Sequence, residues 1–178
     1  MTDPLTPDPP SLLVARWAAR VSATSTRQPR ALDVASGRGR NVEGLLEAGF
    51  AVTAVDVRCD ALRDTAARVR RMDRRFHAVC ADLTTFPLPA ARFELVVATR
   101  FLQRGLCAAL QETLVPGGVI VYETFTELQL RHARGPRSSS HLLRPGELRT
   151  LLRDLEILFD EEVTAPDAVA RIVARRRA

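Results

Sequence analysis

Gly37, Gly39 and Asp56 have the residue types and the spacing of a nucleoside-binding turn. The two glycines follow an apolar run, and Asp56 ends a second apolar run about 20 residues further on. Glycine lets the backbone turn sharply and approach a ligand, and the amides that begin a following helix can donate hydrogen bonds to an anionic group. A carboxylate at a strand end can accept hydrogen bonds from both hydroxyls of a ribose. We therefore expect this segment to form half of a nucleoside site.

Two further aspartates bear on which nucleoside this turn would bind. A dinucleotide fingerprint would have a third glycine where this chain has Val42. Asp33 precedes the turn, where its carboxylate would repel a pyrophosphate but could hold a cationic amino-acid group. Asp82 follows a third apolar run and could accept a hydrogen bond from an adenine amino group, with the Leu83 amide facing the ring. A simpler interpretation stays open, because Asp33 could cap a helix, and Asp56 and Asp82 could be turn residues.

A family resemblance begins with the pattern Asp33-x-x-x-Gly37-x-Gly39 and continues through the strand FELVVATRFLQR and the turn VPGG. With the aspartates at the second and third strand ends, this pattern resembles the class I S-adenosylmethionine-dependent methyltransferases over roughly residues 30–175. The segments DVASGRGRN, VYETFTELQ and LLRPGEL are similar to small bacterial methyltransferases of the tellurite-resistance type. The resemblance implies S-adenosylmethionine as cofactor and S-adenosylhomocysteine as product.

The resemblance also implies which residues bind the cofactor. The turn 37–41 would wrap the methionine part, and Arg40 could pair with its carboxylate. Backbone carbonyls at the end of the fourth strand would face its amino group. The predicted cofactor residues are Asp33, Ala35, Ser36, Gly37, Gly39, Arg40, Asn41, Asp56, Val57, Asp82, Leu83, Ala98 and Thr99.

The methyl acceptor is expected beyond the ends of the fourth and fifth strands, where open α/β sheets bind ligands. Arg100 and Arg104 predict an acceptor, or a transition-state oxygen, that carries negative charge. A chalcogen or a readily ionised oxygen nucleophile would need no strong general base. The loop 126–141 is long and polar enough to act as a lid. The predicted catalytic residues are Arg100, Arg104 and Glu123, and the predicted substrate-binding residues are Arg100, Tyr122, Phe125 and His141.

The alternation of short apolar runs with amphipathic stretches predicts an α/β protein. The expected fold is a Rossmann-like three-layer sandwich, with a mostly parallel seven-stranded sheet and a C-terminal antiparallel hairpin. Strands are expected at 31–35, 51–55, 76–80, 93–98, 119–125, 155–163 and 168–176, and helices at 40–47, 59–71, 102–114 and 145–153.

The chain is expected to divide into three parts. Residues 1–10 should be a disordered N-terminus, because four of the eleven prolines lie there. Residues 11–29 should form a helix capped by Ser11 and a linker, with the helix over the cofactor side or the sheet edge. Residues 30–178 should form the S-adenosylmethionine-binding domain.

Composition limits the partners. All 26 basic residues are arginine, so the net charge of +5 reflects a residue bias as much as a binding surface, and no nucleic-acid partner is expected. No apolar run approaches the ~18 residues of a membrane span, and the N-terminus lacks a signal pattern, so the expected location is cytoplasmic. Cys59, Cys80 and Cys107 lack metal or redox spacing and are expected to be reduced, partly buried residues, with no metal bound.

Three functions remain open from the sequence. The first is methyl transfer to a small-molecule acceptor, the second a non-catalytic S-adenosylmethionine-binding regulatory module, and the third an RNA methyltransferase. The sequence ATRF replaces the D/N-P-P-Y motif of amino-directed nucleic-acid methyltransferases, which favours the first. The oligomeric state does not follow from these patterns.

Overall fold

The computed structural model describes residues 9–69 and 75–177, in two compact units, residues 1–86 and 87–178. The predicted N-terminal tail, 1–10, lies outside the described residues except for Pro9 and Pro10. Seven strands form one sheet with the order β3-β2-β1-β4-β5-β7-β6. The predicted mostly parallel sheet with an antiparallel C-terminal end is therefore confirmed.

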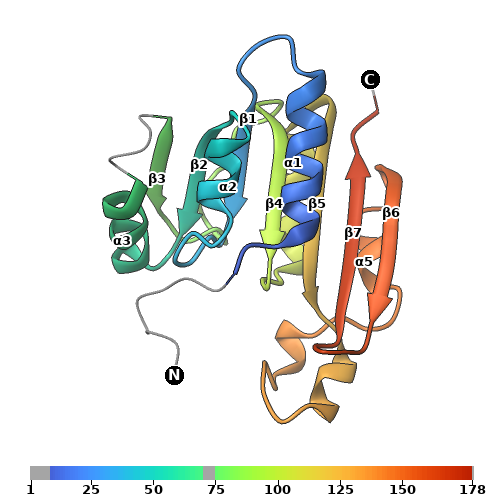
Figure 1. Cartoon of the computed structure of the whole chain (residues 1–178). Helices are drawn as coiled ribbons and strands as arrows, with labels where there is room; N and C mark the ends of the chain where they lie inside the picture. Colours follow the sequence, from blue (N-terminus) through green and yellow to red (C-terminus); the bar gives the residue numbers. More distant parts are fainter. Residues whose placement is uncertain (1–8, 70–74, 178) are drawn as a thin grey trace. The chain divides into compact units, whose positions relative to one another are not determined.

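The first unit alternates helices and parallel strands (Figure 1). Strand β2 pairs with both β1 and β3 in parallel, so the carboxyl ends of all three strands lie at the same edge. Its elements are α1 (Leu12–Thr24), β1 (Arg30–Val34), α2 (Val42–Glu47), β2 (Ala51–Asp56), α3 (Cys59–Val69) and β3 (Phe76–Cys80).

Helix α1 begins where the sequence predicts but ends later. The Ser11 hydroxyl caps it by accepting a hydrogen bond from the amide of Val14. Residues 22–24, expected in the linker, continue the helix, and the hydroxyl of Thr24 donates a hydrogen bond to the Val21 carbonyl at 3.0 Å. The helix lies along α2, where the Ser22 hydroxyl donates to the Ala48 carbonyl at 2.6 Å.

The second unit pairs β4 with β5 in parallel and then β5 with β7 and β7 with β6 in antiparallel ladders. In Figure 1, α5 lies behind β6 and β7. Its elements are β4 (Phe93–Thr99), η1 (Arg104–Leu106), α4 (Cys107–Thr113), β5 (Leu114–Phe125), η2 (Glu127–Arg131), η3 (Ser139–His141), α5 (Glu147–Leu151), β6 (Glu156–Val163) and β7 (Val169–Arg175).

The largest differences from the predicted boundaries of the second unit lie between residues 102 and 118. The helix expected over 102–114 is a 3-10 turn followed by the shorter α4, which ends at Thr113. Strand β5 starts at Leu114, and the predicted turn 115–118 is an irregularity inside it: the pairing moves from Phe93–Leu114 to Leu95–Val119. Glycine is needed there because Gly117 has a φ of +79°.

The prediction that all three cysteines are reduced is wrong for Cys59 and Cys80, which form a disulfide. Their Cα atoms are 5.2 Å apart, a typical disulfide separation, because α3 begins just after β2 and Asp56 of β2 pairs with Cys80 of β3. The sequence separation of 21 residues gives no signal of this proximity. Cys107 is free and buried, as expected.

Candidate functional site

The turn after β1 adopts left-handed backbone conformations at alternate positions. The φ angles are +50° at Ala35, +53° at Gly37 and +68° at Gly39. A Cβ atom on Gly39 would lie 2.5 Å from Cγ2 of Thr65, so α3 packs against this glycine. A Cβ atom on Gly37 would meet nothing within 4 Å, so its backbone faces open space that a ligand could occupy.

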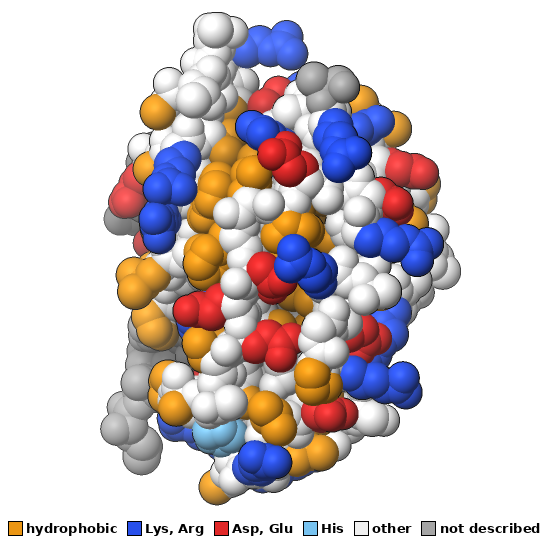
Figure 2. All heavy atoms as spheres, turned by 90° about the vertical axis from the view of Figure 1, so that its right-hand side faces the viewer, with side chains coloured by type: hydrophobic (Ala, Val, Ile, Leu, Met, Phe, Trp, Pro, Cys, Tyr) orange, Lys and Arg blue, Asp and Glu red, His pale blue; other side chains and the backbone are white. Residues whose placement is uncertain are grey.

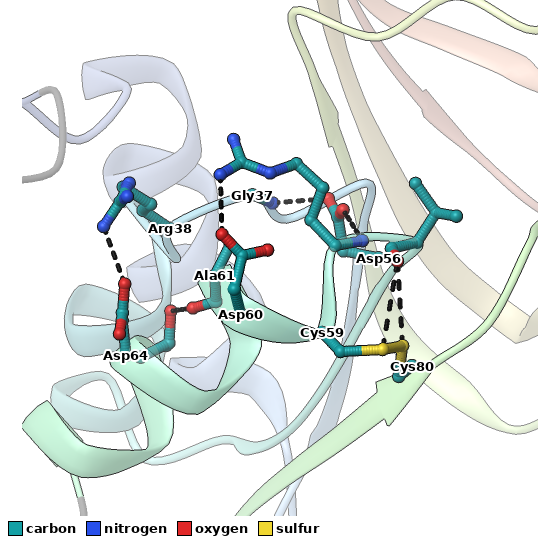
Figure 3. Close-up of polar contacts among 11 residues, drawn as sticks. Gly37, Arg38, Asp56, Cys59, Asp60, Ala61, Asp64 and Cys80 are labelled. Atoms are coloured by element: carbon teal, nitrogen blue, oxygen red, sulfur yellow. Dashed lines mark hydrogen bonds and ion pairs between the residues drawn. A yellow bond between two sulfur atoms is a disulfide. The ribbon is translucent and has the colours of Figure 1, made fainter.

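Asp56 holds the turn against the end of β2. Its Oδ2 accepts a hydrogen bond from the Gly37 amide at 2.7 Å, and its Oδ1 accepts one from the Arg58 amide at 2.8 Å (Figure 3). The residue is 7% exposed. An ionised carboxylate has about four acceptor sites, so two remain for hydroxyl donors such as those of a ribose.

Asp33 is a buried carboxyl group in β1. It is 1% exposed, and its Oδ2 has no hydrogen-bond partner within the described residues. Burial raises the pKa of Asp33 to about 7; the nearby Arg40 cation opposes this rise and the Asp56 anion adds to it. Near neutral pH the group is thus poised between its two protonation states, and a cationic ligand would favour the ionised one.

Asn41 connects the turn to the N-terminal helix. Its Oδ1 accepts a hydrogen bond from the Ser11 amide at 3.1 Å, so this predicted cofactor residue also fixes the first turn of α1. The neighbouring Ser36 hydroxyl is buried and has no hydrogen-bond partner within residues 9–69 and 75–177. The sequence did not indicate this contact of Ser11 with a predicted cofactor residue, because the two lie 30 positions apart.

Asp82 stabilises its own turn. Its Oδ1 accepts hydrogen bonds from the amide and hydroxyl of Thr84 at 2.8 and 2.7 Å, and these bonds lower its pKa. This geometry fits the simpler interpretation as a turn residue and leaves Oδ2 available to a ligand. Leu83 is buried beside it, whereas Val57, at the end of β2, is 67% exposed.

The predicted acceptor residues of the second unit occupy different environments. Arg100 follows β4 with a φ of +56°, and its amide donates to the Glu123 carbonyl at 2.8 Å. Such strain in a residue other than glycine is frequent at functional sites. Tyr122 is fully buried in β5, while His141 is exposed in η3. Ala98 and Thr99 are buried at the end of β4, and Phe125 is half-buried at the end of β5.

Two of the predicted catalytic side chains bind other parts of the chain. The Arg104 guanidinium pairs with both carboxylate oxygens of Glu147, at 2.6 and 2.9 Å, and donates to the Leu142 carbonyl. The Glu123 carboxylate accepts from Arg171, at 2.9 Å, across the β5–β7 ladder. These contacts give Arg104 and Glu123 structural partners, so their assignment to catalysis stays a prediction.

Comparison with known proteins gives the family. The methyltransferase domain family matches residues 31–118. The malonyl-[acyl-carrier protein] O-methyltransferase of Enterobacter lignolyticus (strain SCF1) is 33% identical over 129 residues, which are 68% of this chain and 47% of that protein. The chain thus spans about half the length of this curated relative.

Two crystal structures show the same fold. The 1,6-didemethyltoxoflavin-N1-methyltransferase of Burkholderia thailandensis, with bound 1,6-didemethyltoxoflavin and S-adenosylhomocysteine, has a TM-score of 0.68 at 22% identity over 93% of this chain and 79% of its own. TehB of Haemophilus influenzae has a TM-score of 0.72 at 18% identity over 92% of this chain and 61% of its own. The chain therefore belongs to the class I S-adenosylmethionine-dependent methyltransferases, as the sequence predicts, and it shares its fold with TehB.

Proposed function

We propose that this chain transfers a methyl group from S-adenosylmethionine to a small-molecule acceptor that is anionic or a chalcogen nucleophile. The observation that carries the proposal is the cluster of Asp33, Gly37 and Asp56 at the carboxyl edge of β1 and β2. It combines a buried carboxyl oxygen without a hydrogen-bond partner, an open glycine and a second carboxylate with acceptor sites to spare.

These residues fit the groups of S-adenosylmethionine. Asp56 would accept the ribose hydroxyls while it still holds the Gly37 amide. Asp33 would lie on the side of the cationic amino-acid group, and Asp82 with the Leu83 amide would frame the adenine. The sulfonium supplies an activated methyl group, so the chain's part is to orient the cofactor and exclude water.

The nature of the acceptor is the finer part of the proposal. The exposed Arg100 after β4 supports an anionic acceptor. The Enterobacter relative is named as a malonyl-[acyl-carrier protein] O-methyltransferase, which supports an oxygen nucleophile. The substrate-binding predictions remain Tyr122, Phe125 and His141. Because Tyr122 is buried, its part would be to support the residues that line the site. We also propose that residues 30–178 act as one methyltransferase domain.

The partners and location follow as further parts of the proposal. Among the described residues, no helix is long and apolar enough to cross a membrane, and no group of His, Cys, Asp or Glu side chains is suited to a metal ion. We propose a small-molecule substrate without a nucleic-acid partner, and a cytoplasmic location.

Calorimetric titration with S-adenosylhomocysteine, followed by a labelled-methyl assay on anionic small molecules and RNA, tests the proposed function. We expect cofactor-product binding and methylation of a small anion. Binding without turnover on any acceptor would contradict the proposal and favour the regulatory module. Strongly salt-dependent RNA binding with methylation of RNA would favour the third function.

A further inference from the structure

The Cys59–Cys80 disulfide joins the two strand ends that would hold the nucleoside. Cys59 begins α3 three residues after Asp56, and Cys80 ends β3 two residues before Asp82. The two sulfur atoms lie 4.0 and 3.7 Å from the carbonyl oxygen of Val57 (Figure 3). The covalent bond therefore fixes the β3 end against the segment that follows β2.

Strand β3 is held by few elements. Among the described residues it is an edge strand that pairs with β2, and α3 packs against it. Its five residues are half-buried or exposed, unlike the mainly buried strands β1 and β4. Beyond the ladder itself, the Ala81 amide donates to the Asp56 carbonyl at 3.0 Å. Loss of the disulfide would thus leave the Asp82 turn tied to Asp56 only by the end of the β2–β3 ladder and the Ala81 hydrogen bond, without removing any core packing.

The disulfide is also open to a thiol. Cys80 is exposed and Cys59 is half-buried. Because Cys59 is the first residue of α3, the helix N-terminus would stabilise it as a leaving thiolate. An incoming thiolate would therefore attack Sγ of Cys80. Exposed disulfides are the ones that exchange readily, whereas buried disulfides serve mainly for stability.

We propose that Cys59–Cys80 is a site of reversible thiol–disulfide exchange with a dithiol, and that its reduction weakens binding at the proposed nucleoside site. This inference rests on the proposed function. The dithiol thiolate forms a bond to Cys80 Sγ as the S–S bond breaks and Cys59 leaves as a thiolate. The second thiol of the reagent then displaces Cys80. The dithiol loses two electrons and two protons as it becomes a disulfide, and the two cysteines gain them as thiols.

The test compares S-adenosylhomocysteine binding by the full chain before and after dithiothreitol. Thiol titration of the unfolded chain should find one free thiol, that of Cys107, without reductant, and all three after reduction. Reduction should weaken the affinity by about fivefold or more, because the β3 end must then be ordered on binding. Reoxidation should restore it.

Variants distinguish the effect of reducing Cys59–Cys80 from other effects of the reductant. The double variant Cys59→Ser/Cys80→Ser should bind with the reduced affinity whether or not reductant is present, while Cys107→Ala should keep the full response. Equal affinities of the oxidised and reduced chain, or three free thiols after air oxidation, would overturn the inference alone. Absence of binding in both states would overturn the proposed function as well. The comparison between the oxidised and the reduced native chain does not depend on the folding of any variant.

Discussion

The protonation state of Asp33, the buried carboxyl group of β1, determines how strongly this group attracts a cationic ligand. With its pKa raised to about 7 by burial, the group is mostly neutral at pH 6 and mostly ionised at pH 8. We expect the affinity for S-adenosylhomocysteine, whose amino group is cationic, to rise over this interval by up to about tenfold per pH unit. Calorimetry at pH 6, 7 and 8 measures this. Asp33→Asn should abolish the rise, and a rise of the same size in that variant would contradict the role of Asp33.

The raised pKa of Asp33 also predicts that the free energy of unfolding falls as pH rises, although the ligand affinity rises. The folded chain holds a proton on Asp33 from about pH 4 to about pH 7, where the unfolded chain has lost it. The free energy of unfolding must therefore fall as pH rises through this window, by about 1.4 kcal/mol for each unit. Chemical denaturation of the ligand-free chain at pH 5 and pH 7 should show a larger loss than in Asp33→Asn. An equal loss in both chains would assign the effect to other groups.

The two glycines of the turn predict different defects. Gly37→Ala places a methyl group in open space, so it should cost only about 1 kcal/mol of stability from its positive φ but weaken cofactor-product binding strongly. Gly39→Ala adds a collision with Thr65, so its stability loss should be larger, on the order of 3 kcal/mol. Denaturation and calorimetry on both variants measure this. Thr65→Ala should partly restore stability to Gly39→Ala; no difference between the two glycine variants would contradict the packing.

At the scale of the elements, the Arg104–Glu147 pair joins η1 to the start of α5. Both bonds to the Glu147 carboxylate are partly buried, and the backbone carbonyls of Ser140 and Leu142 accept hydrogen bonds from two further guanidinium N–H groups. We expect Arg104→Ala to lower the free energy of unfolding by about 1–2 kcal/mol. Arg149→Ala, which removes the exposed pair with Asp160, should cost less than about 0.5 kcal/mol. An Arg104→Ala chain of full stability and impaired kcat would instead support the catalytic role predicted from the sequence.

Local patterns predicted the elements better than the contacts between them. The strand at 76–80 was predicted with its observed ends, because a short, mainly apolar run lies there between Arg75 and Asp82. The break of the 102–114 helix was not predicted; it lies at Arg104, whose partner Glu147 is 43 residues away in the sequence. The same limit explains Cys59–Cys80 and Ser11–Asn41, whose partners meet only through the fold.

The arrangement of the candidate site was easier to predict for the residues of the first unit than for those of the second. Asp33, Gly37, Gly39 and Asp56 share one continuous strand, turn, helix and strand, so their spacing alone brings them together. Arg104 and Glu123 carry charges that the sequence can show, but their partners, Glu147 and Arg171, come from later elements. Charge without its partner is thus weak evidence of a binding role.

At the scale of the whole molecule, the net charge is +5, yet many arginine side chains lie next to the carboxylates with which they pair. Figure 2 shows red and blue side chains next to one another on the face that carries the β6 edge, where Arg149 pairs with Asp160 and Arg175 with Glu156. Such alternation blunts an edge strand against pairing with another chain and does not form a single-sign surface for nucleic acid.

The most direct measurement is the affinity for S-adenosylhomocysteine of three chains: native, Asp56→Ala and Asp64→Ala. Asp56 bonds to the Gly37 amide, whereas Asp64, nearby on α3, makes an exposed pair with Arg38 of the turn. We predict that the native chain binds, that Asp56→Ala binds at least about tenfold more weakly, and that Asp64→Ala stays within about twofold. A native chain that does not bind, or an Asp56→Ala chain with native affinity, would contradict the account.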